Sequence, residues 1–492
     1  METIFSIKPL LAICISVLLP AILVSCKADN VREGWTFAAA ILKFAVIASM
    51  LPLILAGHQI EHTVAQVLPG VAIKLRIDAF GMVFALVSSF LWIVTTIYSI
   101  GYMRGLNEHS QTRYFCFFAV SLSAAVGVAF AGNLLTLYLF YEMLSFATYP
   151  LVTHHQDEEA RSSGRKYLFY ILGSSIGLVL PAMLITYHLT GTLEFASTGF
   201  MAGAAKPATI TVLLVCYLFG FAKAGLMPLH SWLPAAMVAP TPVSALLHAV
   251  AVVKVGVFCV VRVITCVFGV DLLRTLHLGT LAAVIASITI LVASLIAMSQ
   301  DGLKRRLAFS TIGQLAYIVL GVALLSPSGL TGSMLHIAMH AFGKITLFFC
   351  AGAIFVATGE KYISKMAGLG KRMPITMTAF FLGALSVIGI PPLGGFISKW
   401  NLVLGTLEAN QLALLFVLLT SSILNAVYFL PIVYKAFFCT PEESLYDEYQ
   451  EAPLWCLAPP VFTAICSVIL FFYPQPFLRL AQMAAAGFLG GT

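Results

Sequence analysis

Residues 134–152 read LLTLYLFYEMLSFATYPLV, an apolar run long enough to cross a bilayer, with Glu142 near its middle. Five lysines lie inside other apolar runs: Lys43, Lys223, Lys254, Lys344 and Lys399. A charge at the centre of a membrane costs roughly 2.5–3.5 kcal/mol even on the most lenient insertion scale. Such groups are tolerated where they meet one another or water inside the protein, and they typically mark ion pathways. The sequence therefore predicts a protein that moves ions across a membrane.

The composition is that of a multi-pass, all-α membrane protein. Of the 492 residues, 60% are hydrophobic and only 10% are charged, which soluble domains of this length do not show. At roughly 20 residues per span, the apolar runs predict about fourteen transmembrane helices. We place them at 10–26, 35–57, 79–103, 113–131, 133–153, 166–189, 208–230, 241–268, 272–298, 307–325, 332–357, 374–397, 409–437 and 453–480.

Lysine and arginine are distributed unevenly between the predicted loops, and the richer side is expected to face the cytoplasm. The loops on one side carry fifteen of these cations. The loops and termini on the other side carry seven, and Arg262 is counted among them. We therefore predict a bacterial-type cell membrane location with both termini outside the cytoplasm. The net charge of +7 follows from this distribution and indicates no nucleic-acid partner.

Proline and glycine interrupt two of the predicted spans, each near a lysine. The breaking residues are Gly225, Pro228 and Pro234 in the seventh span and Gly389, Pro391 and Pro392 in the twelfth. Unwound backbone at membrane depth needs protein or water beside it. Matched breaks are typical of inverted repeats, and an offset of five spans inverts the second repeat. Two ordinary proline kinks are the alternative interpretation.

This symmetry divides the chain into four predicted parts. They are 1–112 with helices 1–3, 113–268 with the first five-helix repeat (helices 4–8), 269–440 with the second, inverted repeat (helices 9–13), and 441–492 with helix 14. The polar stretch from Thr440 to Glu451 is the expected cytoplasmic connection before the last helix.

The buried charges suggest a proton relay. Lys223 is the expected partner of Glu142, since an opposite charge offsets the loss of hydration; a static ion pair that only fixes helix packing is the alternative. Lys254, Lys344 and Lys399 have no acid of their own within the spans. Burial disfavours the charged form of lysine, so these groups can exchange protons near neutral pH. Lys43 is expected to reach the cytoplasmic interface instead.

Histidines supply possible intermediate stations. His336, His340 and Lys344 are spaced four residues apart and fall on one stripe of a helix. Imidazole can both accept and donate a proton near neutral pH, although histidines hydrogen-bonded to the backbone for structural reasons are the alternative. His248 and Lys254 are six residues apart, so they face different sides of the eighth helix.

Neither a metal nor a cofactor is predicted. His336 and His340 lack an acidic third ligand, and Lys344 would repel a cation. The ten cysteines show no ligand spacing, so we expect no redox centre in this chain. We assign no chemistry to His154 and His155 at the predicted interface.

Four long motifs resemble one known family. They are FAKAGLMPLHSWLPAAMVAPTPVSALLHAVAVVKVG at 221–256, DGLKRRLAFSTIGQLAYIVLG at 301–321, HIAMHAFGKITLFFCAG at 336–352 and IGIPPLGGFISKW at 388–400. They resemble the antiporter-like membrane subunits of respiratory complex I, membrane-bound hydrogenases and Mrp-type cation/proton antiporters. The resemblance covers roughly residues 70–440 and implies fourteen helices with two inverted five-helix repeats.

The resemblance also implies roles for single residues. Glu142 falls at the family's fifth-helix glutamate, Lys223 at the lysine of the broken seventh helix and Lys254 at the eighth-helix lysine. Lys399 falls at a twelfth-helix position that is lysine in some branches and glutamate in one complex I branch. His336 and His340 resemble the polar residues between the two half-channels, and Lys344 resembles an eleventh-helix lysine found in part of the family.

Two functions stay open from the sequence. Similarity to the D-type subunits of Mrp antiporters favours a gradient-driven cation (sodium)/proton antiporter built with other membrane subunits. The string His-Ser-Trp-Leu-Pro is equally typical of complex I and hydrogenase subunits, in which this chain would be the proton-pumping arm of a redox enzyme. A purely structural scaffold would not need unpaired lysines at membrane depth.

Overall fold

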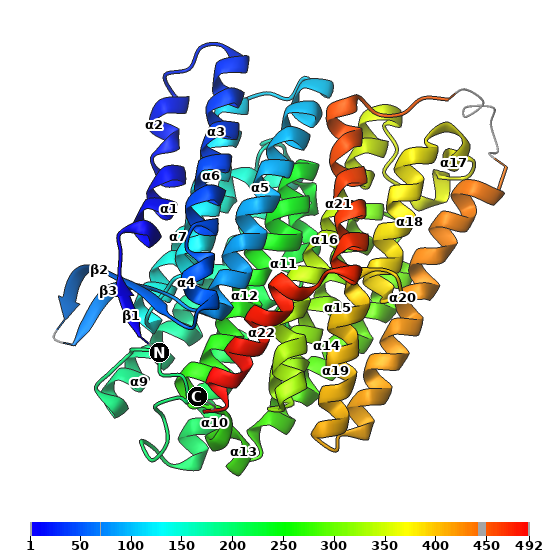
Figure 1. Cartoon of the computed structure of the whole chain (residues 1–492). Helices are drawn as coiled ribbons and strands as arrows, with labels where there is room; N and C mark the ends of the chain where they lie inside the picture. Colours follow the sequence, from blue (N-terminus) through cyan, green and yellow to red (C-terminus); the bar gives the residue numbers. More distant parts are fainter. Residues whose placement is uncertain (1, 69, 441–448, 491–492) are drawn as a thin grey trace.

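A computed structural model describes residues 2–68, 70–440 and 449–490 of the chain. Most of them form long helices that lie side by side in one bundle (Figure 1). The helices are α1 (Lys8–Val17), α2 (Leu19–Leu23), α3 (Asp29–Ala48), α4 (Leu51–Leu55), α5 (Ala79–Gly105), α6 (Gln111–Ala129), α7 (Leu134–Val152), α8 (Glu158–Ser174), α9 (Leu180–Thr190), α10 (Pro207–Gly220), α11 (Trp232–Ala235), α12 (Val252–Arg262), α13 (Val270–Thr275), α14 (Leu278–Ser299), α15 (Leu303–Ala323), α16 (Pro327–Thr358), α17 (Leu369–Arg372), α18 (Pro374–Ile388), α19 (Gly394–Glu408), α20 (Leu412–Phe438), α21 (Leu454–Phe472) and α22 (Gln475–Phe488).

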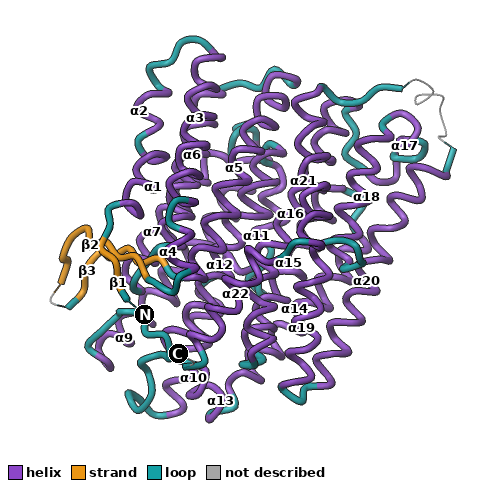
Figure 2. Tube along the Cα trace, viewed as in Figure 1, coloured by secondary structure: helices purple, strands orange, loops and turns teal. Residues whose placement is uncertain are grey.

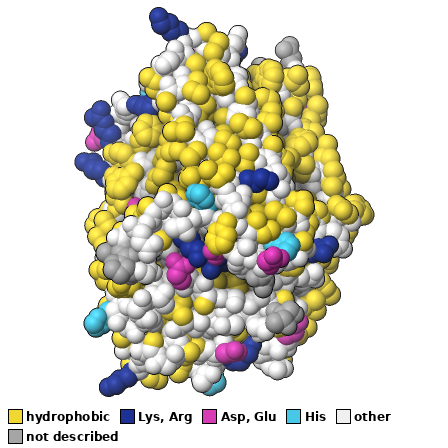
Figure 3. Space-filling model, turned by 60° about the vertical axis from the view of Figure 1, so that its left-hand side comes forward, with side chains coloured by type: hydrophobic (Ala, Val, Ile, Leu, Met, Phe, Trp, Pro, Cys, Tyr) yellow, Lys and Arg dark blue, Asp and Glu magenta, His cyan; other side chains and the backbone are white. Residues whose placement is uncertain are grey.

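The helical membrane architecture expected from the sequence is confirmed. Within the described residues, 10 helical segments are long and apolar enough to cross a membrane, and three shorter apolar helices join them, at Lys8–Leu23, Pro207–Gly220 and Pro374–Ile388. Large apolar side chains face outward, such as Phe169 with 76% of its surface exposed and Phe416 with 66%. Hydrophobic side chains cover much of the face in Figure 3, as a lipid-facing surface requires. The count of fourteen and the four-part division stay predictions.

A small sheet that the sequence did not predict lies at the side of the bundle (Figure 2); one of its strands precedes the first helix and two follow α4. Strand β2 (Gln59–Leu68) pairs in parallel with β1 (Thr3–Phe5) and antiparallel with β3 (Val71–Ile77). The β2–β3 pairing joins Ile60 to Ile77, both fully buried.

The chain unwinds at both predicted breaks. Between α10 and α11 only a short 3-10 turn interrupts residues 221–231, and Gly225 takes a left-handed φ of 72°. Between α18 and α19 the chain turns at Gly389, where φ is 91°. Glycine adopts such angles without the steric penalty of a Cβ, which is why helices commonly end there.

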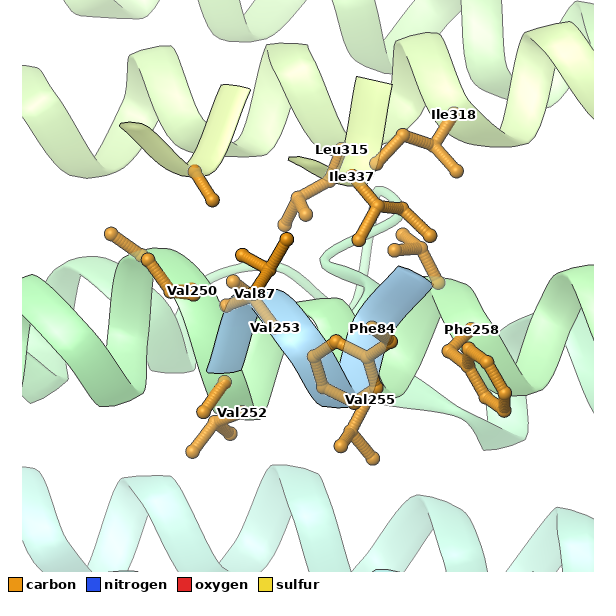
Figure 4. Close-up of a cluster of buried hydrophobic side chains, with 14 of the residues drawn as sticks. Phe84, Val87, Val250, Val252, Val253, Val255, Phe258, Leu315, Ile318 and Ile337 are labelled. Carbon is orange, nitrogen blue, oxygen red and sulfur yellow. The ribbon is translucent and has the colours of Figure 1, made fainter. Parts of the chain in front are cut away.

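The core of the bundle lies where α5, α12, α15 and α16 meet. Figure 4 shows apolar side chains from these helices in contact, among them Phe84, Val253, Leu315 and Ile337. The segment Val243–Phe268 around α12 is buried throughout its most apolar window, so its single lysine has no route to the lipid headgroups. A π-helical stretch leads into α12 and another follows it.

Arg262 is inside the bundle rather than in a loop, so counting it as a loop cation was wrong. It donates to both oxygens of Asp78, at 2.5 and 2.6 Å, and three phenylalanine rings surround it. Asp78 also accepts from the backbone N–H of Gly81 and so caps α5. Burial raises the pKa of the Asp78 carboxyl, but the charge and hydrogen bonds of Arg262 outweigh this effect and the pKa is lowered. The pair locks α12 to the start of α5.

Lys43 is fully buried, so the expectation that it reaches the interface was also wrong. Its Nζ donates to Ser16 Oγ at 2.7 Å and to the carbonyl of Leu122 at 3.0 Å. The two acceptors belong to α1 and α6. Lys43 therefore ties three N-terminal helices together.

The C-terminal region contains two helices where one span, 453–480, was expected. α21 ends at Phe472, and α22 begins after Pro474 and runs obliquely across the bundle towards the C-terminus (Figure 1). Proline cannot donate a backbone hydrogen bond and favours a new helix start. Residues 441–448 of the expected polar connection lie outside the described residues.

The Arg262–Asp78 pair yields a stability prediction. Arg262→Met leaves Asp78 charged and without its counter-ion, so we expect unfolding to become easier by about 3–5 kcal/mol. The measurement is the thermal unfolding midpoint of the purified protein in detergent. The double variant Asp78→Asn/Arg262→Met removes both charges and should recover part of the loss. An unchanged midpoint in Arg262→Met would show that the pair does not hold the fold.

Candidate functional site

Lys223 lies in the unwound segment after α10 and is held by α7. Its Nζ donates to the carbonyl of Tyr141 at 2.8 Å and to Ser145 Oγ at 2.6 Å, and it sits 3.2 Å from the centre of the Tyr141 ring. The adjacent Glu142 does not make the direct ion pair we expected: both of its carboxylate oxygens are buried, and no described residue hydrogen-bonds to them. Two neutral acceptors on the same helix hold the ammonium in its place.

Two residues, one on α11 and one on α12, accommodate this break in the helix. The indole N–H of Trp232 on α11 donates to the freed carbonyl of Ala222 at 2.9 Å. On α12, a Cβ at Gly256 would overlap the backbone of Lys223 and Ala224. Gly256 therefore allows the helix that carries Lys254 to press against the unwound segment that carries Lys223.

Lys254 is hydrogen-bonded to the long helix α16. Its Nζ lies 2.6 Å from His340 Nδ1 and donates to the carbonyl of Ala249 at 2.8 Å. Both side chains are almost completely buried. A lysine and an imidazole in such contact can pass a proton directly, since each can hold it.

His340 continues the line to His336, one turn earlier on α16. The two imidazoles stack with their centres 5.4 Å apart. His336 binds Ser398 Oγ through Nδ1 at 2.8 Å and Gln314 Oε1 through Nε2 at 3.0 Å. Ser398 precedes Lys399 on α19, so the polar line crosses from the centre of the bundle to the second break.

Lys399 uses the carbonyl that the second break releases. Its Nζ donates to the backbone carbonyl of Ile388 at 2.9 Å and to Ser422 Oγ at 3.2 Å. The helical donor for that carbonyl would be the N–H of residue 392, which is proline and has none. The break therefore supplies the acceptor that keeps a lysine at this depth.

Two predicted residues lie beside this line. Lys344 donates to the carbonyl of Leu307 at 3.2 Å and packs near the ring of Phe429, with no hydrogen bond to either histidine. His248 faces away from Lys254, towards the rings of Tyr167 and Trp232. Neither ring nitrogen of His248 has a hydrogen-bond partner among the described residues.

The sequence analysis missed the small polar residues that hold the lysines. Ser145, Ser398 and Ser422 are hydrogen-bonded to Lys223, His336 and Lys399, respectively. In the sequence, these serines are marked only by a hydroxyl group inside an apolar run. Many serines in helices bond only to the backbone of their own helix, as Ser287 does to the carbonyl of Ala283, so the hydroxyl alone does not identify a contact to a lysine or histidine. His336 and His340 stack on one helix rather than converging on a point, and Lys254 occupies His340 Nδ1, so this pair is not arranged to hold a metal.

Comparisons with known proteins identify the family of this chain. Residues 131–425 match the family described as NADH:quinone oxidoreductase/Mrp antiporter, TM. The chain is 34% identical over 416 residues to NADH-quinone oxidoreductase subunit N of Desulforudis audaxviator (strain MP104C), covering 82% of this chain and 81% of that one. It is 32% identical to Hydrogenase-4 component B of Escherichia coli (strain K12), covering 81% of this chain and 62% of that protein.

A further relative is the A/B subunit of a probable K(+)/H(+) antiporter of Rhizobium meliloti (strain 1021), 29% identical over 91% of this chain and 45% of the relative. This chain thus spans less than two thirds of the hydrogenase and antiporter relatives. Among solved structures, the Mrp complex from Dietzia sp. DQ12-45-1b contains a chain with a TM-score of 0.87 and 24% identity, covering 98% of this chain and 97% of that one. A chain of the membrane-bound sulfane sulfur reductase, an archaeal respiratory membrane complex, gives a TM-score of 0.86 at 24% identity and covers 98% of this chain and 96% of that one.

These structural likenesses establish the fold, and the family match spans more than half of the chain. The resemblance inferred from the four motifs is confirmed. The protein is a multi-pass membrane subunit, antiporter-like or complex I-like, that belongs to the NADH:quinone oxidoreductase/Mrp antiporter transmembrane family.

Proposed function

We propose that this chain moves protons through a buried relay, as one member of a multisubunit monovalent cation (Na⁺)/proton antiporter. The proposed relay groups are Glu142, Lys223, Lys254, Lys344 and Lys399, with His248, His336 and His340 as linking groups. The observation that carries the proposal is the contact of Lys254 with His340 and of His336 with Ser398, next to Lys399. Titratable groups in contact at membrane depth are the components that proton transfer requires.

The proposed mechanism starts at Glu142. A change of charge there alters the electrostatic environment of Lys223, whose ammonium rests on the carbonyl of the neighbouring Tyr141. Lys223 then passes the change to Lys254 on α12, the helix that packs closely against the unwound segment at Gly256. The proton then moves over the two stacked histidines to Lys399, which exchanges it with one side of the membrane.

One further feature supports inverted repeats as part of this proposal. Each break contains a glycine with a left-handed φ, Gly225 and Gly389. We propose the corresponding division at 1–112, 113–268, 269–440 and 441–492, with both termini outside the cytoplasm of a bacterial-type cell.

The second candidate function is that of the proton-pumping arm of a complex I-like NADH:quinone oxidoreductase or a membrane-bound hydrogenase. A relative of matched length favours it, since NADH-quinone oxidoreductase subunit N of Desulforudis audaxviator aligns over 82% of this chain and 81% of its own. The same relay would serve, but the energy would come from redox centres on other chains.

Removing either group at the start of the relay is expected to stop transport. Lys223→Ala deletes the ammonium beside α7, and Glu142→Ala deletes the charge that acts on it. In membrane vesicles that carry the whole complex, proton movement should fall to background while the assembled complex keeps its size. Lys43→Ala is the matched control, since Lys43 is a buried lysine with a serine and a carbonyl as acceptors but lies off the relay. Normal transport in either relay variant would contradict the proposal.

The histidine step gives a second prediction. His340→Leu removes the group that contacts Lys254, and a lost proton carrier typically costs a factor of about 10² or more in rate. We expect that loss in the initial rate of proton movement, with assembly unchanged. His188→Leu, at an exposed position of α9, is the control. A variant rate within twofold of the control would remove His340 from the relay.

The two candidate functions differ in their partners. The tagged protein is purified from its native membrane in mild detergent, and its partners are identified by mass spectrometry. We expect a set of small membrane subunits that contain neither flavin nor iron–sulfur centres. Co-purification of flavin- or iron–sulfur-bearing subunits would instead establish the pumping arm of a redox complex.

A further inference from the structure

A carboxylate and three imidazoles gather at one end of the bundle, away from the relay. Glu108 and His109 lie in the connection between α5 and α6, and His154 and His155 follow the end of α7. Glu108 Oε2 is 3.6 Å from His154 Nε2, 3.7 Å from His155 Nδ1 and 3.9 Å from His109 Nδ1. Two connections 45 residues apart in sequence thus direct their ligand atoms towards one oxygen.

These spacings are close to those of a metal site. Bonds of 2.0–2.1 Å at a tetrahedral angle place neighbouring N and O ligands about 3.3 Å apart. The three observed distances are a few tenths of an ångström longer, which small side-chain rotations can remove. Ligand atoms of Glu108, His109 and His154 also lie within 4.8 Å of one another. Imidazole nitrogen and carboxylate oxygen are ligands that Zn²⁺ accepts.

His154 points to a missing ligand. Its side chain is fully buried, and neither ring nitrogen has a hydrogen-bond partner among the residues that the structure describes. A buried polar group without a hydrogen-bond partner is destabilising, so we expect a ligand of this imidazole at that place. The 3.6 Å to Glu108 is too long for a hydrogen bond but suits two ligands of one ion.

The second nitrogen of His109 is already held. His109 Nε2 lies 3.0 Å from the backbone carbonyl of His154, an acceptor that requires the proton on Nε2. That tautomer leaves the lone pair on Nδ1, the nitrogen that faces Glu108. Metal-binding histidines are usually oriented in this way by a carbonyl or carboxylate behind them.

The cluster can be reached from outside the protein. Glu108 and His155 line a cavity of about 730 Å³, and His109 is 52% exposed. The guanidinium of Arg113 beside the cluster donates to the carbonyl of His154 at 2.9 Å.

We propose that Glu108, His109 and His154 bind a divalent transition-metal ion of the zinc class, with His155 beside them near the same Glu108 oxygen. This site is separate from the proposed relay. A bound ion would join the α5–α6 connection to the end of α7, the helix that carries Glu142, at the wall of the cavity. The sequence analysis predicted no metal because it considered ligand spacing only within short motifs.

The test uses untagged full-length protein, stripped with a chelator and kept in mild detergent. We expect calorimetry with Zn²⁺ to give one site per chain, and Co²⁺ to give the visible absorption of a tetrahedral nitrogen–oxygen complex. His154→Gln and Glu108→Gln should each weaken Zn²⁺ binding at least tenfold. His188→Gln, an exposed histidine elsewhere, and His340→Leu in the relay should leave it unchanged.

A thermal readout protects the test against misfolded variants. Zn²⁺ should raise the unfolding midpoint of the wild type and of His188→Gln, because a ligand of the native state stabilises it by mass action. It should not raise the midpoint of His154→Gln or Glu108→Gln. Absence of saturable Zn²⁺ binding to the wild type would overturn the proposal. Binding that survives in both ligand variants, or that disappears in His340→Leu, would also overturn it, and none of these results bears on proton transport.

Discussion

A bilayer interior has no water to satisfy an ammonium group or an unpaired backbone carbonyl, and this constraint organises the bundle. Each of the five lysines in the apolar runs resolves it in the same way, by donating to a main-chain carbonyl. The acceptors are the carbonyls of Leu122, Tyr141, Ala249, Leu307 and Ile388. A carbonyl carries two lone pairs, so a helix can accept such a bond and keep its own. Neutral acceptors hold the lysines without pairing them permanently with a carboxylate.

The helix breaks follow from the same constraint. At the second break, Pro392 cannot donate to the carbonyl of Ile388, and Lys399 takes that carbonyl instead. At the first, Trp232 takes the carbonyl of Ala222, and Gly256 lets α12 approach the unwound backbone. In each break, a protein side chain thus binds a carbonyl that the unwinding frees, as non-helical backbone at membrane depth requires.

Arg262 and the lysines show two uses of buried charge. Arg262 and Asp78 form a two-point ion pair surrounded by phenylalanine rings, which fixes α12 against α5. Guanidinium stays protonated in proteins, so this pair is structural. Lys254 instead contacts His340, a group that can take its proton. The Arg262–Asp78 ion pair and the Lys254–His340 contact therefore involve the same helix, α12.

The sequence alone determined the membrane class, both helix breaks and the identity of the buried charges, because apolar length, proline and glycine act locally. It also predicted that His336 and His340 share a stripe, since helical spacing decides that. Only the tertiary structure decided which group each side chain meets. It separated Glu142 from Lys223, buried Lys43 and Arg262, divided the last predicted span and brought Glu108 to His154. These outcomes depend on distances between helices far apart in the sequence, where packing against neighbours, rather than local spacing, selects the hydrogen-bond partner.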